Sequence, residues 1–99
     1  MRTVMVRYKV KPNRVAENEG LIAKVYEQLR HENPAGLHYA TYKLDDGVSF
    51  VHIATLETDG SNPLLEVSAF KTFTSGVKER CDELPVSTTV TRVGSYEPR

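Results

Sequence analysis

His52 is the residue of this 99-residue chain whose position most suggests acid–base chemistry. It lies within the alternating segment SFVHIATLE, residues 49–57, which predicts a β-strand with His52 on the same face as Phe50. A neutral imidazole in such a place could remove a proton from a bound ligand, because its pKa lies near neutrality. It could equally be a core histidine that hydrogen-bonds Thr41 or Tyr39 on the neighbouring strand.

Asn18 and Arg92 are two further candidates for catalytic groups at the same site. Asn18 lies four residues before Ile22 on the apolar stripe of a predicted helix, and Arg92 lies on the predicted last strand, on its helix-facing side. Either side chain could stabilise an oxyanion that develops on a bound ligand. The alternatives are a half-exposed residue near the helix start for Asn18 and a surface ion-pair residue for Arg92.

Cys81 is the single cysteine, so the sequence excludes an internal disulfide and a multi-cysteine metal site. We expect a half-buried thiol near a helix end more than a nucleophile, and a lone cysteine favours a reducing, cytoplasmic compartment. The three histidines lack metal-ligand spacing, and there is no glycine-rich phosphate loop or catalytic serine motif. We therefore predict no metal and no cofactor.

Length and charge narrow the function classes. Ninety-nine residues predict a single domain, residues 1–99, with a modest core. Thirteen basic residues balance thirteen acidic ones and are scattered, whereas a nucleic-acid binder needs a concentrated basic face. No apolar run approaches the roughly 18 residues of a membrane span, and the strand-like start has no signal-peptide core. We therefore expect neither a nucleic-acid partner nor a membrane.

The elements that must position these residues follow from periodicity. Alternation predicts strands, apolar residues three and four apart predict helices, and Asn13 and Asn62 are candidate caps of the two helical regions. The predicted elements are a strand at 2–11, a helix at 14–32, strands within 36–44 and 48–57, a helical region at 63–81 and a strand at 86–94. This β-α-β-β-α-β order predicts an α+β, ferredoxin-like fold, with a four-stranded antiparallel sheet and both helices on one face.

Asp46 and Gly47 predict a type I′ turn between the two neighbouring strands in the middle of the chain. If these two residues form the loop, Thr41 lies opposite His52. A register change of one residue would move every side chain of the strand to the other face.

The two faces of the predicted sheet have different uses. Apart from Arg7, the helix-free face carries mainly apolar side chains, which are too numerous to lie bare in water as one patch. They are Met5, Ala40, Tyr42, Val51, Ile53 and Val93. A second copy of the same sheet would cover that face, so the pattern predicts a homodimer. The helix-facing side predicts an apolar cavity suited to a planar aromatic ligand. The expected ligand-binding residues are Tyr8, Tyr26, Tyr39, Thr41, Phe50, Leu56 and Phe73.

Two segments resemble a known family. The strand FVHIATLET and the helix LLEVSAFKTFTSGV, with the order and spacing of the elements, are similar to the dimeric α/β-barrel superfamily, specifically the antibiotic biosynthesis monooxygenase (ABM) type. The resemblance covers nearly the whole chain and implies a pocket between the sheet and the helices. Characterised members of that family include cofactor-independent oxygenases of polycyclic phenols or quinols, and haem-degrading enzymes.

Three positions depart from the family pattern. Haem-degrading members use an asparagine on the first strand, where this chain has Val6; many members have a tryptophan near the end of the third strand and a histidine at the start of the second helix, where this chain has Leu56 and Leu64. The resemblance therefore argues against haem degradation. It implies an ABM-like protein that binds a small aromatic phenol or quinol, and that oxidises it without a cofactor if it is an enzyme. The alternatives are a non-catalytic binding or stress-response module, and a structural partner protein with a collapsed, dry pocket.

Overall fold

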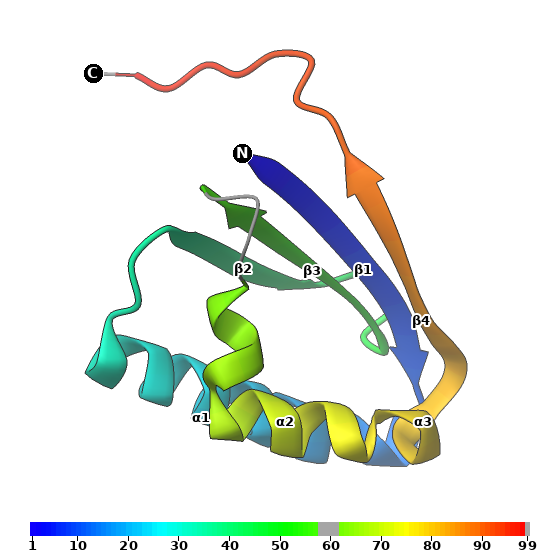
Figure 1. The fold of residues 1–99 in the computed structure, drawn as a ribbon. Helices are drawn as coiled ribbons and strands as arrows, with labels where there is room; N and C mark the ends of the chain where they lie inside the picture. The colour runs from blue at the N-terminus through cyan, green and yellow to red at the C-terminus, as the bar shows by residue number, and fades with distance from the viewer. Residues whose placement is uncertain (58–61, 99) are drawn as a thin grey trace.

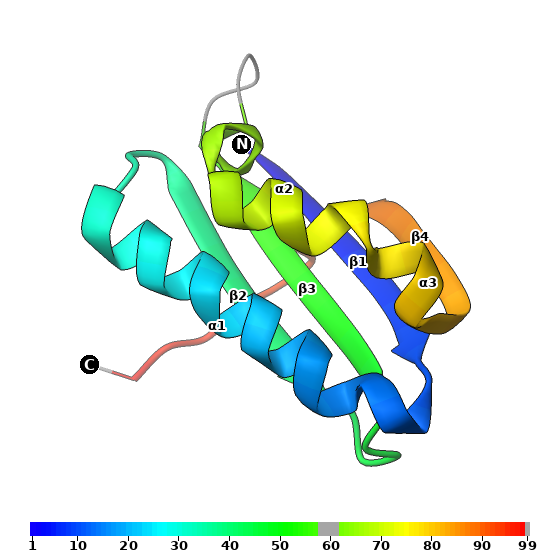
Figure 2. The same ribbon diagram turned by 90° about the horizontal axis from the view of Figure 1, so that it is seen from below.

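The computed structural model describes residues 1–57 and 62–98 of the chain. The strands are β1 (Arg2–Val10), β2 (Leu37–Lys43), β3 (Ser49–Leu56) and β4 (Cys81–Val90), and the helices are α1 (Val15–Glu32), α2 (Ser68–Ser75) and α3 (Val77–Arg80), with 3₁₀ helices at Pro12–Arg14 and Pro63–Glu66. The strands form one antiparallel sheet in the order β2-β3-β1-β4. The helices form a second layer on one face of this sheet (Figures 1 and 2). The predicted α+β, ferredoxin-like fold is confirmed.

The central strands β1 and β3 direct alternate side chains toward the helices, as the alternation predicts. Tyr8 pairs with Phe50, and Val6 pairs with His52. Thr41 on β2 also pairs with His52, which confirms the predicted register of the β2–β3 hairpin. The buried core therefore lies between the sheet and the helices, around Tyr8 and Phe50.

The turn between β2 and β3 is not of the predicted type. A type I′ turn needs positive φ at both central residues, but only Gly47 has one, at 77°. The backbone N–H of Leu44 donates to the carbonyl of Ser49 at 2.9 Å, so the loop spans 45–48. The Asp46 carboxylate accepts hydrogen bonds from the backbone N–H groups of Val48 and Ser49. The longer loop adds one residue to each side, which keeps the register unchanged.

The helix ends confirm one predicted cap and contradict the other. Asn13 does not cap α1, because it lies inside a 3₁₀ helix that leads into α1 without a side-chain cap. Asn33 ends α1 in the left-handed region, with φ 46°, and its N–H donates to the carbonyl of Leu29. Asn62 does cap the second helical region, because its side chain accepts from the N–H of Leu64 at 3.0 Å.

The last strand begins five residues earlier than the sequence predicts. β4 starts at Cys81, and Pro85 lies in it because β4 is an edge strand and bulges opposite Tyr8, where no ladder donor is needed. The strand ends at Val90, which pairs with Thr3 on the helix-free face. The expectation that Arg92 lies on the last strand and faces the helices is therefore wrong, because Arg92 lies beyond the strand and is exposed.

The helix-free face of the sheet is uncovered in the single chain. Tyr42 and Val86 on this face are 57% and 63% exposed, and Met5 and Ile53 are half-buried. Residues 91–98 have no regular secondary structure and run along the side of the sheet opposite the helices (Figures 1 and 2). Among the described residues, none of the helices combines the length and apolar character of a membrane span.

Candidate functional site

A cavity of about 330 Å³ lies between the sheet and the second helical region. Most of its wall is apolar, and Val6, Leu56 and Leu64, the three positions that depart from the family pattern, all line it. Its polar groups include the hydroxyls of Tyr8 and Tyr39 and the imidazole of His52. An apolar chamber with a few convergent polar groups is the usual composition of a small-molecule site.

His52 is joined to protein hydroxyls at both ring nitrogens. Its Nε2 lies 2.8 Å from the Tyr8 hydroxyl, and its Nδ1 lies 2.6 Å from the Tyr39 hydroxyl and 3.1 Å from Oγ1 of Thr41. The ring is 5% exposed and packs against the Phe73 ring, with 5.4 Å between centroids. His52 is thus both of the things that the sequence allows, a satisfied core histidine and a wall of the cavity.

Asn18 continues the hydrogen-bond chain away from the cavity. Its side chain is completely buried, so it is not the half-exposed residue considered as an alternative. Its amide Nδ2 donates to the Tyr8 hydroxyl at 2.9 Å, and its Oδ1 accepts from Nε of Arg80 at 3.1 Å. Asn18 therefore bridges Tyr8 to a buried arginine and does not reach the cavity itself.

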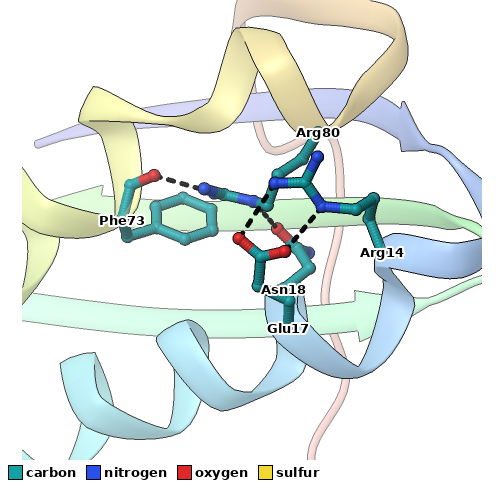
Figure 3. A network of polar contacts seen from close by, with 5 residues as sticks. All are labelled: Arg14, Glu17, Asn18, Phe73 and Arg80. Carbon is teal, nitrogen blue, oxygen red and sulfur yellow. Dashed lines mark hydrogen bonds and ion pairs between the residues drawn. The ribbon is translucent and has the colours of Figure 1, made fainter.

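Arg80 is the functional candidate that sequence reasoning misses. It is 2% exposed, its Nη2 donates to the carbonyl of Phe73 at 2.8 Å, and its guanidinium lies 5.2 Å from the centre of the Phe73 ring (Figure 3). The Arg14–Glu17 ion pair lies nearby. The hydrogen bond from Arg14 is the main cause that lowers the pKa of Glu17, and the positive charges of Arg14 and Arg80 add to it. The signal for Arg80 was present, because Phe73, Val77 and Arg80 share one helical face.

The other end of this network of hydrogen bonds, opposite Arg80, reaches the protein surface. Oγ1 of Thr41 lies 2.8 Å from the Tyr26 hydroxyl, and the Tyr26 and Tyr39 rings stack with 5.3 Å between centroids. Tyr26 and Tyr39 line a second, shallower depression with Arg30, which lies over the Tyr26 ring. Hydrogen bonds therefore connect the interior at Arg80 to this depression through His52.

Burial controls the protonation states of the side chains in this hydrogen-bond network. Desolvation lowers the pKa of His52 to about 4, so the imidazole is neutral at neutral pH. Desolvation also raises the pKa of Tyr8 and Tyr39 above their ordinary value, although the Asn18 bond acts in the other direction at Tyr8. Both tyrosines are therefore phenols that can donate, and both are weaker acids than an ordinary phenolic ligand.

The structure sorts the predicted site residues into three groups. His52, Tyr8, Tyr39, Leu56 and Phe73 line the cavity. Four predicted residues contact the lining residues without lining the cavity themselves. Asn18 hydrogen-bonds Tyr8, and Thr41 hydrogen-bonds His52. Tyr26 hydrogen-bonds Thr41, and Phe50 stacks on Tyr8. Arg92 does not join the site. Across residues 1–57 and 62–98, no three or more His, Cys, Asp or Glu side chains gather as a metal site would require.

No protein-family model and no curated protein matches this chain. Solved structures do match it. A candidate antibiotic biosynthesis monooxygenase from Nitrosomonas europaea superposes with a TM-score of 0.76 at 15% identity, covering 95% of this chain and 100% of that chain. A mutant of SnoaB, a cofactor-independent oxygenase from Streptomyces nogalater, superposes with a TM-score of 0.67 at 16% identity, covering 95% of this chain and 94% of that chain. PA3566 from Pseudomonas aeruginosa gives 0.71 at 18% identity, covering 94% of each chain.

Identities below one fifth establish a shared backbone and leave the chemistry to be argued from the site. The superpositions cover nearly the whole of this chain and of those structures. The chain has the fold of the antibiotic biosynthesis monooxygenases.

Proposed function

We propose that the cavity binds a small aromatic phenol or quinol and that the protein oxidises it with dioxygen, without a cofactor. The observation that carries this proposal is the direct contact of His52 with two tyrosine hydroxyls in the wall of a mostly apolar chamber. Aromatic rings at Tyr8, Tyr39 and Phe73 suit a planar ligand. The fold shared with SnoaB, a cofactor-independent oxygenase, supports the same reaction class.

Proton removal in this site has to pass through a tyrosine, because both ring nitrogens of His52 already contact protein hydroxyls. The ligand hydroxyl gives its proton to the oxygen of Tyr8, while the Tyr8 proton moves to Nε2 of His52. The resulting electron-rich anion reacts with dioxygen at a ring carbon that carries one hydrogen, and His52 returns its proton to give a hydroperoxide. The hydroperoxide loses water: one oxygen atom forms the new carbonyl, and the other leaves with the hydrogen of that carbon and the returned proton.

The free-energy cost of this proton transfer selects the substrate. A phenol with a pKa of about 10 lies about six units above His52, whose pKa is about 4, so ionisation costs about 8 kcal/mol. Attraction between the two new charges, about 5 Å apart, returns about 3 kcal/mol. Each unit by which the ligand pKa falls below 10 removes about 1.4 kcal/mol more. The site therefore favours acidic, electron-rich phenols and quinols over simple phenols.

Oxygen uptake with anthrone and with substituted hydroquinones tests the proposal. We expect turnover in the wild type and at least a tenfold loss in His52→Gln and Tyr8→Phe, since each removes one step of the proton path. His31→Gln is the matched control, because it removes an exposed imidazole of α1. Turnover that His52→Gln leaves unchanged would eliminate His52 as the proton acceptor.

A second candidate function is binding without turnover. The low pKa of His52 and the bonding of both its nitrogens favour it, because a weak and fully bonded base is better suited to shaping a pocket than to catalysis. Equilibrium dialysis with the same phenols distinguishes the two. Retention of a phenol without oxygen uptake by the wild type would favour the binding module.

We also propose that the protein works as a homodimer through the helix-free face of its sheet. That face presents Met5, Val51, Ile53 and Val86 on three adjacent strands, with Arg7 between Val51 and Val86. The same surface on a second copy would cover it through a two-fold contact. Sedimentation of the wild type should give a dimer and Ile53→Glu a monomer, with Leu65→Glu, on the helical side, as the control. A monomeric wild type at micromolar concentration would contradict the proposal.

A further inference from the structure

The hydrogen bonds through the site have a direction that the buried end of the network, Arg80, imposes. An arginine can only donate hydrogen bonds, so Oδ1 of Asn18 must face Arg80. The amide nitrogen of Asn18 then faces Tyr8 and donates to its oxygen. Because the Tyr8 oxygen already accepts this bond, its own proton remains available for the next partner, which is Nε2 of His52.

The same assignment of donors and acceptors decides which ring nitrogen of the neutral imidazole carries the proton. If Nε2 accepts from Tyr8, the ring proton is on Nδ1, and Nδ1–H donates to the Tyr39 oxygen. In the other tautomer the Tyr8 oxygen would receive two hydrogen bonds, and its own proton would have no acceptor in the described part of the chain. Tyr8 is 2% exposed, and an unsatisfied buried donor costs about 1–3 kcal/mol. The Nδ1–H tautomer should therefore prevail by about fivefold or more.

The Nδ1–H tautomer changes what the cavity offers to a ligand. In this tautomer the Tyr39 oxygen accepts the hydrogen bond from Nδ1 of His52, so the Tyr39 hydroxyl can donate its own proton to another acceptor. Its possible acceptors are the neighbouring hydroxyl of Thr41 and an oxygen atom in the cavity that Tyr39 lines. A ligand oxygen is the stronger of these acceptors when it is a carbonyl or a phenolate, because charge-assisted and carbonyl bonds exceed hydroxyl–hydroxyl ones.

We propose that Arg80 and Asn18 are positioning residues that hold His52 in the Nδ1–H tautomer, and that this arrangement makes Tyr39 the donor that recognises an acceptor oxygen of the ligand. The second half rests on the proposed function, because it supposes that the cavity takes an aromatic ligand. It assigns to Tyr39 the oxyanion contact for which the sequence suggests Asn18 or Arg92. The ligands favoured are phenolates and aromatic ketones, the ionised substrate and the product of the proposed oxidation.

Asn18→Asp tests the positioning half because it keeps the shape of the side chain, replaces the amide donor by an acceptor and adds one negative charge. A carboxylate accepts on both oxygens, so it would accept from Arg80 and also from the Tyr8 hydroxyl. The Tyr8 proton would then turn away from His52, and the ring proton would move to Nε2. Asn13→Asp adds the same charge at an exposed position just before α1 and is the matched control.

Nitrogen chemical shifts of the imidazole, measured on the unliganded protein at neutral pH, report the tautomer directly. The His52 signals are identified by their loss in His52→Gln. We expect a protonated Nδ1 and an unprotonated Nε2 in the wild type and in Asn13→Asp, and the reverse in Asn18→Asp. A protonated Nε2 in the wild type overturns the proposal, and this holds even if Asn18→Asp fails to fold.

Binding of 1-tetralone and tetralin, which differ by one carbonyl oxygen, tests the recognition half. The ratio of their dissociation constants should favour the ketone about tenfold more in the wild type than in Tyr39→Phe or Asn18→Asp, the size of one hydrogen bond. An equal ratio in the wild type and in Tyr39→Phe removes Tyr39 as the donor. If neither compound binds, the ligand contact of Tyr39 is contradicted, whereas oxygen uptake with anthrone still decides the proposed function and the nitrogen shifts still decide the positioning role.

Discussion

The low pKa of His52 predicts a specific loss of stability in mild acid. The folded imidazole has a pKa of about 4, whereas an unfolded histidine has a pKa of about 6.5. Between these values the unfolded chain binds a proton that the folded chain does not, so acidification favours unfolding. The stabilising contribution is complete above about pH 6.5 and is lost as the pH falls through about 4.

The magnitude follows from the two pKa values. The full shift of about 2.5 units corresponds to about 3 kcal/mol, and between pH 7.5 and pH 5.0 the loss is about 2 kcal/mol. A domain of this size is stable by only about 5–15 kcal/mol, so the loss is measurable. For a urea dependence of about 1–2 kcal/mol/M, the unfolding midpoint should fall by about 1–2 M.

Urea unfolding at pH 7.5 and pH 5.0, in the wild type and in His52→Gln, isolates this contribution. The variant should be less stable at pH 7.5, because it loses the bonds to Tyr8 and Tyr39. Its stability should nevertheless change less with pH, by about 2 kcal/mol. His31→Gln should keep the wild-type pH dependence. Equal losses in the wild type and in His52→Gln would refute a buried, neutral His52.

Three further outcomes follow from packing. Gly76→Ala should destabilise the fold by about 1 kcal/mol in urea, since its Cβ would lie 3.0 Å from Nη1 of Arg80, whereas Gly20→Ala meets nothing and should stabilise α1 by about 0.5–1 kcal/mol. Cys81 should react with a thiol reagent far more slowly in the native protein than in urea, because it is buried and desolvation raises the pKa of its thiol. Phe73→Ala should cost about 3–5 kcal/mol in urea unfolding and enlarge the cavity.

Local patterns were enough to predict the fold and the central part of the site. Strand alternation placed His52 toward the helices, and the turn at Gly47 fixed its register against Thr41 even though the turn type differs. Asn18 was noticed because a polar residue on an apolar stripe is anomalous, and it is completely buried. These predictions depend on neighbours within a few residues, which one sequence displays directly.

The wrong start of the last strand, and with it the wrong place of Arg92, results from the properties of a sheet edge. Asp82, Glu83 and Pro85 indicate a loop, yet they lie in β4, because an edge strand tolerates proline and exposed charge. That late start moved the predicted strand toward the C-terminus and placed Arg92 on it. Arg80 was missed for the opposite reason, since a charged residue at a helix end is normally solvated and its buried partners come from distant elements.

Protonation of His52 should disrupt the hydrogen-bond network through Tyr8 as well as lower the stability of the fold. A charged imidazole donates from both nitrogens, so the Tyr8 oxygen would receive bonds from Asn18 and His52 at once, and the Tyr8 proton would lose its acceptor. This conflict adds to desolvation in holding His52 neutral. Nitrogen shifts followed toward lower pH should therefore show no His52 charging in the folded protein down to about pH 5, and Asn18→Asp should charge at higher pH. Charging of wild-type His52 near pH 6.5 would mean that neither burial nor the Arg80-directed chain controls it.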